Sequence, residues 1–165
     1  MEDLKLLTQN NVPTEELAEN AVKEYRGIRL NYVEVFYLDY AVDEDTGLID
    51  KSKKVKYYTK NQIGRNLRAL KNAYLISKGA ADPEEILTFR KRYNIAASTL
   101  SIILGFSKNT ISNIEKEGMS SLPTGRLIKL CLEDVEVMSH YINLCDGLEN
   151  AKKIELSKKI KEKNV

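Results

Sequence analysis

The chain has 165 residues, of which 42% are hydrophobic and 30% are charged. This length suits one domain of moderate size or two small ones, and the composition is typical of a folded protein with a buried core. With 26 basic residues against 24 acidic ones, the formal net charge is +2, which excludes a histone-like protein that binds nucleic acid through its overall charge.

Membrane and redox signals are weak in this sequence. No apolar run approaches the roughly 18 residues needed to cross a bilayer, and no basic-then-apolar leader opens the chain. We therefore expect a cytoplasmic protein without a membrane partner. Cys131 and Cys145 are too few for a disulfide framework or a zinc site. We interpret them as small buried residues on helices, and the only histidine, His140, as a surface residue.

The first 80 residues are expected to form a small twisted sheet of two or three strands. The segment 27–40, GIRLNYVEVFYLDY, is rich in β-branched and aromatic residues, with alternating apolar side chains at Ile28, Leu30 and Tyr32. Residues 26–27 are a candidate hairpin turn, and DEDTG at 43–47 is a second one.

A change of period at Thr59 predicts a helix that follows the sheet. Thr59 is a candidate cap, and the helix is expected to close near Gly79. Its apolar positions, at helical spacing, are Ile63, Leu67, Leu70 and Tyr74. We expect this stripe to pack on the sheet, whose candidate core residues are Tyr25, Ile28, Leu30, Tyr32, Val35, Phe36, Leu38 and Tyr40. Two interpretations, a solvated face or a partner surface, remain open for the basic residues Lys60, Arg65, Arg68, Lys71 and Lys78.

The second region opens on a clear helix start. Asp82 is a candidate N-cap, Pro83 takes the first helical position, and Glu85 can bond back to the cap. A boundary is expected at residues 79–81, followed by five short helices between residues 83 and 146. The remainder, residues 149–165, has many lysines and few apolar residues, so we expect a solvated or frayed helix there.

The stretch ILGFSKNTISNIEKEG, residues 103–118, has the pattern of a helix-turn-helix. Gly105 would allow the sharp turn, and the first helix would be apolar inside at Leu100, Ile103 and Leu104. Ile111 and Ile114 would anchor the second helix, and Ser107 would cap it. Its exposed arc carries polar side chains that a DNA groove can admit: Lys108, Asn109, Thr110, Ser112 and Asn113.

The run from residue 82 to residue 130 resembles the repressor-type (XRE/Cro-like) helix-turn-helix, and in particular the DNA-binding half of MqsA-type (YgiT-like) antitoxins. The residues that carry the resemblance are Arg90, Ile95, Ala96, Ala97, Leu100, Ser101, Leu104, Gly105, Phe106, Ser107, Ile111, Ser112, Ile114, Glu115, Gly118, Leu122, Pro123 and Leu127. Upstream, residues 24–50 occupy the place of that family's zinc ribbon.

Together, pattern and resemblance predict an α+β protein with three parts. Residues 1–80 would form a β-sheet and a helix that bind a partner protein, such as a cognate toxin. Residues 81–148 would form an all-α, five-helix, lambda-repressor-like domain that binds double-stranded operator DNA as a homodimer. Residues 149–165 would form the lysine-rich tail. The expected function is sequence-specific transcription regulation by an antitoxin that represses its own operon.

The expected DNA contacts fall into two sets. Lys108, Asn109, Thr110 and Asn113 would read bases, and the resemblance matches Asn109 to a base-reading asparagine. Phosphates would be contacted by Ser107, Ser112, Arg90, Arg92, Lys116 and Arg126. Five residues at helical spacing are expected to serve mainly as core, with one or two in a symmetric dimer contact: Val135, Met138, Tyr141, Ile142 and Cys145.

The sequence also departs from the family. It has no paired cysteines before Cys131, so we expect no zinc and no other cofactor, and Ala96 and Ala97 replace a usual hydroxyl cap and a usual glutamine. A DNA contact commonly made there is missing. Two alternatives therefore remain: a module that neutralises a partner without binding DNA, and a stand-alone phage or mobile-element repressor. No phosphate-loop spacing or nucleophile with a nearby base predicts an enzyme.

Overall fold

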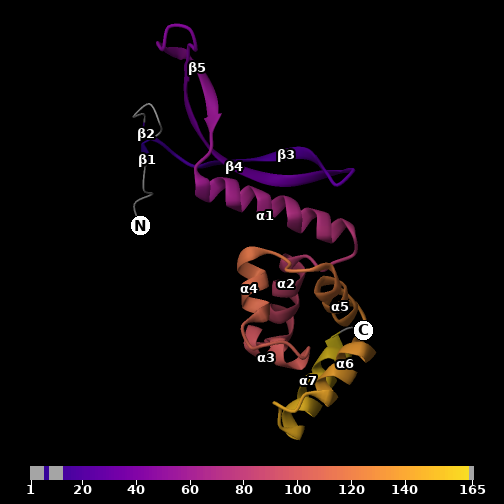
Figure 1. Ribbon diagram of the computed structural model, residues 1–165. Helices are drawn as coiled ribbons and strands as arrows, with labels where there is room; N and C mark the ends of the chain where they lie inside the picture. Colours follow the sequence, from indigo (N-terminus) through magenta and orange to yellow (C-terminus); the bar gives the residue numbers. More distant parts are fainter. Residues whose placement is uncertain (1–5, 8–12, 164–165) are drawn as a thin grey trace. The chain divides into compact units, whose positions relative to one another are not determined.

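The computed structural model describes residues 6–7 and 13–163, and it confirms the α+β class (Figure 1). Within this part of the chain, a three-stranded antiparallel sheet is followed by seven helices. The chain divides into two compact units, the first ending at Ala73 and the second beginning at Tyr74. The division falls inside helix α1 (Lys60–Ser77), several residues before the predicted boundary at 79–81.

The sheet has the order β3 (Leu17–Tyr25), β4 (Ile28–Val42), β5 (Ile49–Tyr57). The long strand β4 pairs with β3 along its first half and with β5 along its second half. Two short strands, β1 (Leu6–Leu7) and β2 (Pro13–Thr14), pair with each other in a separate sheet.

Both predicted turns are confirmed. Arg26 and Gly27 have φ angles of 49° and 77°, and two successive positive φ angles are typical of the hairpin turns that match the twist of the strands. In the second turn the Asp43 carboxylate accepts hydrogen bonds from the backbone N–H groups of Asp45 and Thr46, each at 2.9 Å. Local sequence therefore decided where β4 begins and ends.

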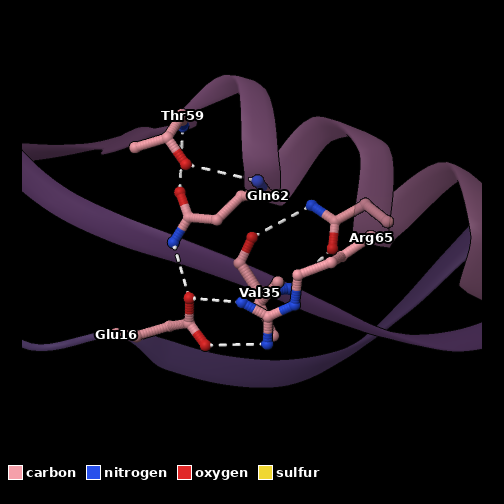
Figure 2. A network of polar contacts seen from close by, with 6 residues as sticks. Glu16, Val35, Thr59, Gln62 and Arg65 are labelled. Atoms are coloured by element: carbon pink, nitrogen blue, oxygen red, sulfur yellow. Dashed lines mark hydrogen bonds and ion pairs between the residues drawn. The ribbon is translucent and has the colours of Figure 1, made fainter. Parts of the chain in front are cut away.

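Helix α1 begins with the predicted cap. The Gln62 backbone N–H donates to Thr59 Oγ1 at 3.2 Å, and the Thr59 N–H donates to Gln62 Oε1 at 3.0 Å (Figure 2). This reciprocal pair is a capping box, which satisfies two backbone donors at the helix start. The Gln62 side chain is almost fully buried, with 1% of its surface exposed.

The predicted apolar face of α1 is wrong at two positions. Ile63 is 49% exposed and Leu67 is 58% exposed, whereas Leu70 is buried. The helix is rotated so that Gln62 and Asn66 face inward. Burying a polar side chain costs free energy when it has no hydrogen-bond partner. Gln62 and Asn66 have such partners, so this cost does not arise, although the apolar spacing predicted that Ile63 and Leu67 would face inward.

Those partners lie on the sheet and just before it. The Asn66 amide donates to the Val35 carbonyl oxygen and accepts from the Val35 N–H, both at 2.9 Å. Pairing of β4 with β5 starts only at Tyr37, so the Asn66 side chain continues the ladder where β5 is absent. Glu16 receives two hydrogen bonds from Arg65, at 2.7 and 2.9 Å, and one from Gln62 at 3.1 Å (Figure 2).

The second unit contains the remaining helices: α2 (Pro83–Tyr93), α3 (Ala97–Ile103), α4 (Thr110–Glu117), α5 (Leu122–Glu133), α6 (Val135–Leu144) and α7 (Asn150–Lys163). Five of them, α2 to α6, lie where five helices were predicted. The capping box at Asp82 and Glu85 is present. All six helices contribute to one apolar cluster, whose most buried members include Ile86, Leu100, Ile111, Ile128, Met138, Ile142 and Leu156.

Helix α7 corrects the expectation of a solvated tail. The segment is helical, but Leu156 and Ile160 are each 1% exposed and belong to the core cluster. The Lys163 ammonium also donates to the Arg92 carbonyl oxygen at 3.1 Å. Leu156 and Ile160 are spaced i, i+4, which places both on one side of the helix. The many lysines around them led to the prediction of a solvated segment.

Several smaller predictions about this unit are confirmed. Cys131 and Cys145 are buried free thiols, and burial raises the pKa of Cys131 to about 11. His140 is exposed. Of the residues considered for both core and dimer contact, Met138 and Ile142 are fully buried and Cys145 is 6% exposed. Val135 and Tyr141 are partly buried against the same cluster. The core role is therefore confirmed for Met138, Ile142 and Cys145, and the dimer contact stays a prediction.

Helix α5 passes very close to the segment that follows α1. The Ala81 N–H donates to the Gly125 carbonyl oxygen at 3.0 Å. A Cβ atom on Gly125 would lie 2.3 Å from the Ala80 Cβ, so only glycine allows this approach. In the part of the chain that the structure describes, no helix is long and apolar enough to cross a membrane.

Candidate nucleic-acid interface

The candidate site is built from α3, the turn after it and α4. Helix α3 ends at Ile103 with Leu104 as its C-cap, and Gly105 has a φ angle of 82°, a conformation in which glycine avoids the steric cost of a side chain. The Phe106 N–H then donates back to the Ser101 carbonyl oxygen at 2.9 Å. The predicted glycine turn is confirmed.

A buried serine joins the two helices. The Ser101 hydroxyl donates to the Ala97 carbonyl oxygen at 2.9 Å and accepts the Ile111 N–H at 3.0 Å. The first N–H groups of a helix lack partners within that helix, so Ser101 supplies one from α3 to α4. Sequence reasoning missed this role. The available signal was a serine among residues predicted to be apolar and buried.

The predicted cap at Ser107 is wrong. Helix α4 begins at Thr110 with Asn109 at the N-cap position, and the Asn109 side chain makes no capping hydrogen bond. The Ser107 hydroxyl instead shares a hydrogen bond with the Thr110 hydroxyl at 2.9 Å. The Asn109 amide is therefore not engaged as a cap.

The two sides of α4 differ sharply in chemistry. Ile111 and Ile114 are 0% and 2% exposed, as predicted. Since successive helical residues are about 100° apart, the residues opposite these anchors form an outer face. We call this set, with Lys108 at its start, the α4 outer face: Lys108, Asn109, Ser112, Asn113 and Lys116. Ser112 is partly buried and the other members are exposed.

Helix α4 has two acidic residues, and one of them is locked away from this face. Glu115 accepts two hydrogen bonds from Arg90, from Nε at 2.7 Å and from Nη2 at 2.8 Å. The Arg90 Nη1 donates to the Ile95 carbonyl oxygen at 3.1 Å. The hydrogen bond with Glu115 raises the pKa of Arg90, against a smaller opposing effect of burial. Planar, two-point pairs of this kind fix geometry as well as charge.

This ion pair corrects the assignment of Arg90 as a phosphate contact, because its guanidinium is committed inside the domain. Arg92 lies two residues further along α2, about 200° around the helix, and its guanidinium donates to the Lys163 carbonyl oxygen on α7. Arg126 donates through Nε to the Lys78 carbonyl oxygen at 2.9 Å. Three other predicted phosphate contacts, Ser107, Ser112 and Lys116, lie in α4 or in the turn before it, beside the predicted base readers.

The alanines at the start of α3 have no polar side-chain atom with which to cap the helix. Ala96 is the N-cap of α3, and no side chain caps that helix. The described residues contain no group of three histidine, cysteine, aspartate or glutamate side chains that could hold a metal ion.

The chain was compared with protein-family models, with curated proteins and with solved structures, and it matches none of them. The resemblance to repressor-type helix-turn-helix proteins therefore stays a prediction.

Proposed function

We propose that this protein is a sequence-specific DNA-binding transcription regulator whose second unit is a helix-turn-helix domain of the lambda-repressor-like kind. The observation that carries the proposal is the α4 outer face. Its amide, hydroxyl and ammonium groups are those that pair with base edges and phosphates in a major groove. Helix α4 itself is fixed on its inner side by the hydrogen bond from the Ile111 N–H to Ser101 and by the Arg90–Glu115 ion pair.

The same proposal assigns DNA reading to Asn109 first. Its side-chain amide can donate and accept at once, which matches the N6 and N7 groups of adenine, and it makes no capping bond that would have to be broken. Lys108, Thr110 and Asn113 would flank it. Lys116, Ser107 and Ser112 would contact phosphates.

We propose further that the protein acts as a homodimer and as the antitoxin of a toxin–antitoxin pair, with the first unit engaging the partner protein. A single α4 reads few base pairs, and dimers place two such helices about 34 Å apart on successive major grooves. A neighbouring open reading frame of similar size would support the antitoxin role, and an isolated gene would support a stand-alone repressor.

The experiment is a selection of bound duplexes from a random DNA library, followed by affinity measurements on the enriched sequence. Asn109→Ala should weaken binding by about 1–3 kcal/mol and relax preference at one base pair. The matched control is Asn143→Ala, an exposed asparagine on α6, which should bind as the wild type does. Equal affinity and specificity of the Asn109 variant would sink the assignment of α4 as the reading helix.

Salt dependence tests the phosphate contacts. Each phosphate contact contributes roughly −0.9 to the slope of log affinity against log salt. Lys116→Ala should therefore reduce the slope by about one contact, while Arg92→Ala should leave it unchanged. With a net charge of +2, non-specific binding should be weak. Steep, sequence-independent binding would instead assign the contact to the lysines of α7.

A second candidate is a protein-interaction module that neutralises its partner without reading DNA. It is favoured by the commitment of Arg90, Arg92 and Arg126 to acceptors within the chain, and by the alanines at positions 96 and 97. Failure of the selection to enrich any sequence, with partner binding intact, would favour this candidate.

A further inference from the structure

Helix α1 carries an unusual outer surface. Ile63 and Leu67 are spaced i, i+4, so they lie on the same side of the helix, and each has about half of its surface exposed. The opposite arrangement is the rule for a helix on a sheet, where apolar residues face inward. Here Gln62 and Asn66 take the inward positions, as their hydrogen bonds to Glu16 and Val35 show.

The same side of α1 is positively charged. Lys60 lies three residues before Ile63 and Lys71 four residues after Leu67, so both extend the Ile63–Leu67 side. Arg68 follows Leu67, and its Nη1 lies 3.7 Å from the position of a Cβ on Gly64. We call Lys60, Ile63, Leu67, Arg68 and Lys71 the α1 outer face.

No acidic residue offsets this charge on the helix. The segment KNQIGRNLRALKNAYLIS contains neither aspartate nor glutamate. Arg65 is paired with Glu16 at 2.7 Å, but Lys60, Arg68 and Lys71 form no ion pair within residues 6–7 and 13–163. The α1 outer face therefore combines two exposed aliphatic side chains with three uncompensated cations.

We propose that the α1 outer face is the docking site for an amphipathic helix of a partner protein. The aliphatic side chains of that helix are flanked by aspartate and glutamate. Charge complementarity identifies the flanking residues, because acidic side chains would pair with Lys60, Arg68 and Lys71. The i, i+4 spacing of Ile63 and Leu67 identifies a helix, since a helix presents apolar anchors at the same spacing. A nucleic acid would use the cations but leave Ile63 and Leu67 in water.

This inference rests on the partner-binding role proposed for the first unit, and it is independent of DNA reading by α4. The occupant is defined by its chemistry: a helix that is apolar on one side and acidic beside it. Binding would bury the two exposed side chains that the polar inner face leaves outside.

The test uses the full chain and two synthetic helical peptides, measured by fluorescence anisotropy. One peptide of about five turns has leucine at positions i, i+3, i+4 and i+7 and glutamate on the flanks; the other has lysine in place of glutamate. The chain should bind the glutamate peptide and bind the lysine peptide at least about tenfold more weakly, a difference of about 1.4 kcal/mol.

Two variants and a control locate the site. Ile63→Ser with Leu67→Ser should weaken binding of the glutamate peptide at least about tenfold, and Lys60→Glu with Lys71→Glu should reverse the peptide preference. Leu130→Ser, which removes an exposed aliphatic side chain from α5, should change nothing. Amide exchange along α1 and β4 should match the wild type in every variant, which separates lost binding from lost folding.

Four outcomes would overturn the proposal. They are no binding of the glutamate peptide, no preference between peptides, self-association that the Ile63/Leu67 variant abolishes, and binding of duplex DNA or anionic vesicles that depends on the cations alone. Each variant should still select the same DNA sequence as the wild type. Loss of peptide binding with DNA selection intact therefore distinguishes failure here from failure of the proposed function.

Discussion

The interactions inside the first unit differ in kind from those inside the second unit. In the first unit, polar side chains of α1 (Gln62, Arg65 and Asn66) bond to Glu16 and to the backbone of Val35. They act beside a small set of buried apolar residues, Leu30, Phe36, Tyr37 and Leu70. In the second, six helices share one apolar cluster, and polar contacts link particular helices: Ser101 joins α3 to α4, and Arg90 joins α2 to α4.

Because of this difference, the two units expose different kinds of side chain. Leu70 of α1 is buried, but hydrogen bonds hold the rest of the inner side of the helix, and its aliphatic residues Ile63 and Leu67 stay exposed. Other exposed aliphatic residues of the first unit lie on the sheet and its turn: Val22, Val33, Leu48 and Ile49. The second unit buries most of its large apolar residues and leaves the α4 outer face polar. On this contrast rest the two proposals, a protein partner for the exposed aliphatic side of the first unit and DNA for the α4 outer face.

The largest expected effect separates the apolar core from the exposed side of α1. Leu100→Ala removes a side chain that is 0% exposed, so it should lower the free energy of unfolding of the second unit by about 3 kcal/mol. Leu67→Ala removes a side chain that is mostly in water and should change the first unit by less than about 0.5 kcal/mol. Denaturant unfolding with amide exchange in each unit measures both.

If Leu67→Ala proves as costly as Leu100→Ala, the exposed side of α1 contributes to the core of the first unit and the comparison fails. Ile63→Ala is the matched repeat on the same side of α1, and it should also be nearly neutral.

The next effect concerns the ion pair behind α4. Arg90→Ala leaves the partly buried Glu115 carboxylate without its two donors, and the free energy of unfolding should fall by about 2 kcal/mol. Arg90→Lys should restore little, because an ammonium cannot make the planar two-point contact. A double-mutant cycle with Glu115→Ala, measured by denaturant unfolding, isolates the pair. Additive single effects would show that the pair carries no coupling.

A smaller effect is expected for the side chain that continues the β4 ladder. Asn66→Ala removes both hydrogen bonds to Val35 and should cost the first unit about 1–2 kcal/mol. Exchange of the Val35 amide should rise, while amides of the second unit stay protected. Asn61→Ala, an exposed position on the same helix, is the control and should leave Val35 exchange unchanged.

The smallest effect is a dependence on acid. Hydrogen bonding from Arg65 lowers the pKa of Glu16, burial opposes this, and the hydrogen bond from Gln62 lowers the pKa further. A carboxyl whose pKa is lower when folded stabilises the fold above its ordinary value of 4.5, and this contribution is lost as pH falls through the lowered value. Glu16→Gln should remove that part of the acid dependence, which can be measured by amide exchange in α1 as a function of pH. An unchanged pH profile would show that the network contributes no such linkage.

Much of the fold could be predicted because its signals are local. The capping box at Asp82 and Glu85, the glycine turn at Gly105 and the hairpin at residues 26–27 each depend on a few neighbouring residues. The same is true of Ile111 and Ile114 as the anchors of α4. Steric limits and unpaired helix-end groups act within one turn, so the sequence alone expresses them.

The candidate site was predicted less completely. Its exposed amides and lysines could be placed on α4 from spacing alone, since helical geometry fixes which residues share a side. The roles of Arg90, Arg92 and Arg126 could not, because a basic side chain is free or committed according to acceptors that lie far along the chain. Arg90 meets Glu115 and Arg92 meets the carbonyl of Lys163.

By itself, the sequence determined the class, the succession of a small sheet, one helix and five further helices, both turns of the sheet and the side of α4 that faces outward. The short strands β1 and β2 were not predicted. Only the tertiary structure decided that Gln62 and Asn66, rather than Ile63 and Leu67, face inward on α1, and that Leu156 and Ile160 join the core. The physical reason is the same in both places. Burial depends on the partners that the rest of the chain supplies, such as the Val35 backbone for an amide and the apolar cluster for α7, and no local pattern specifies them.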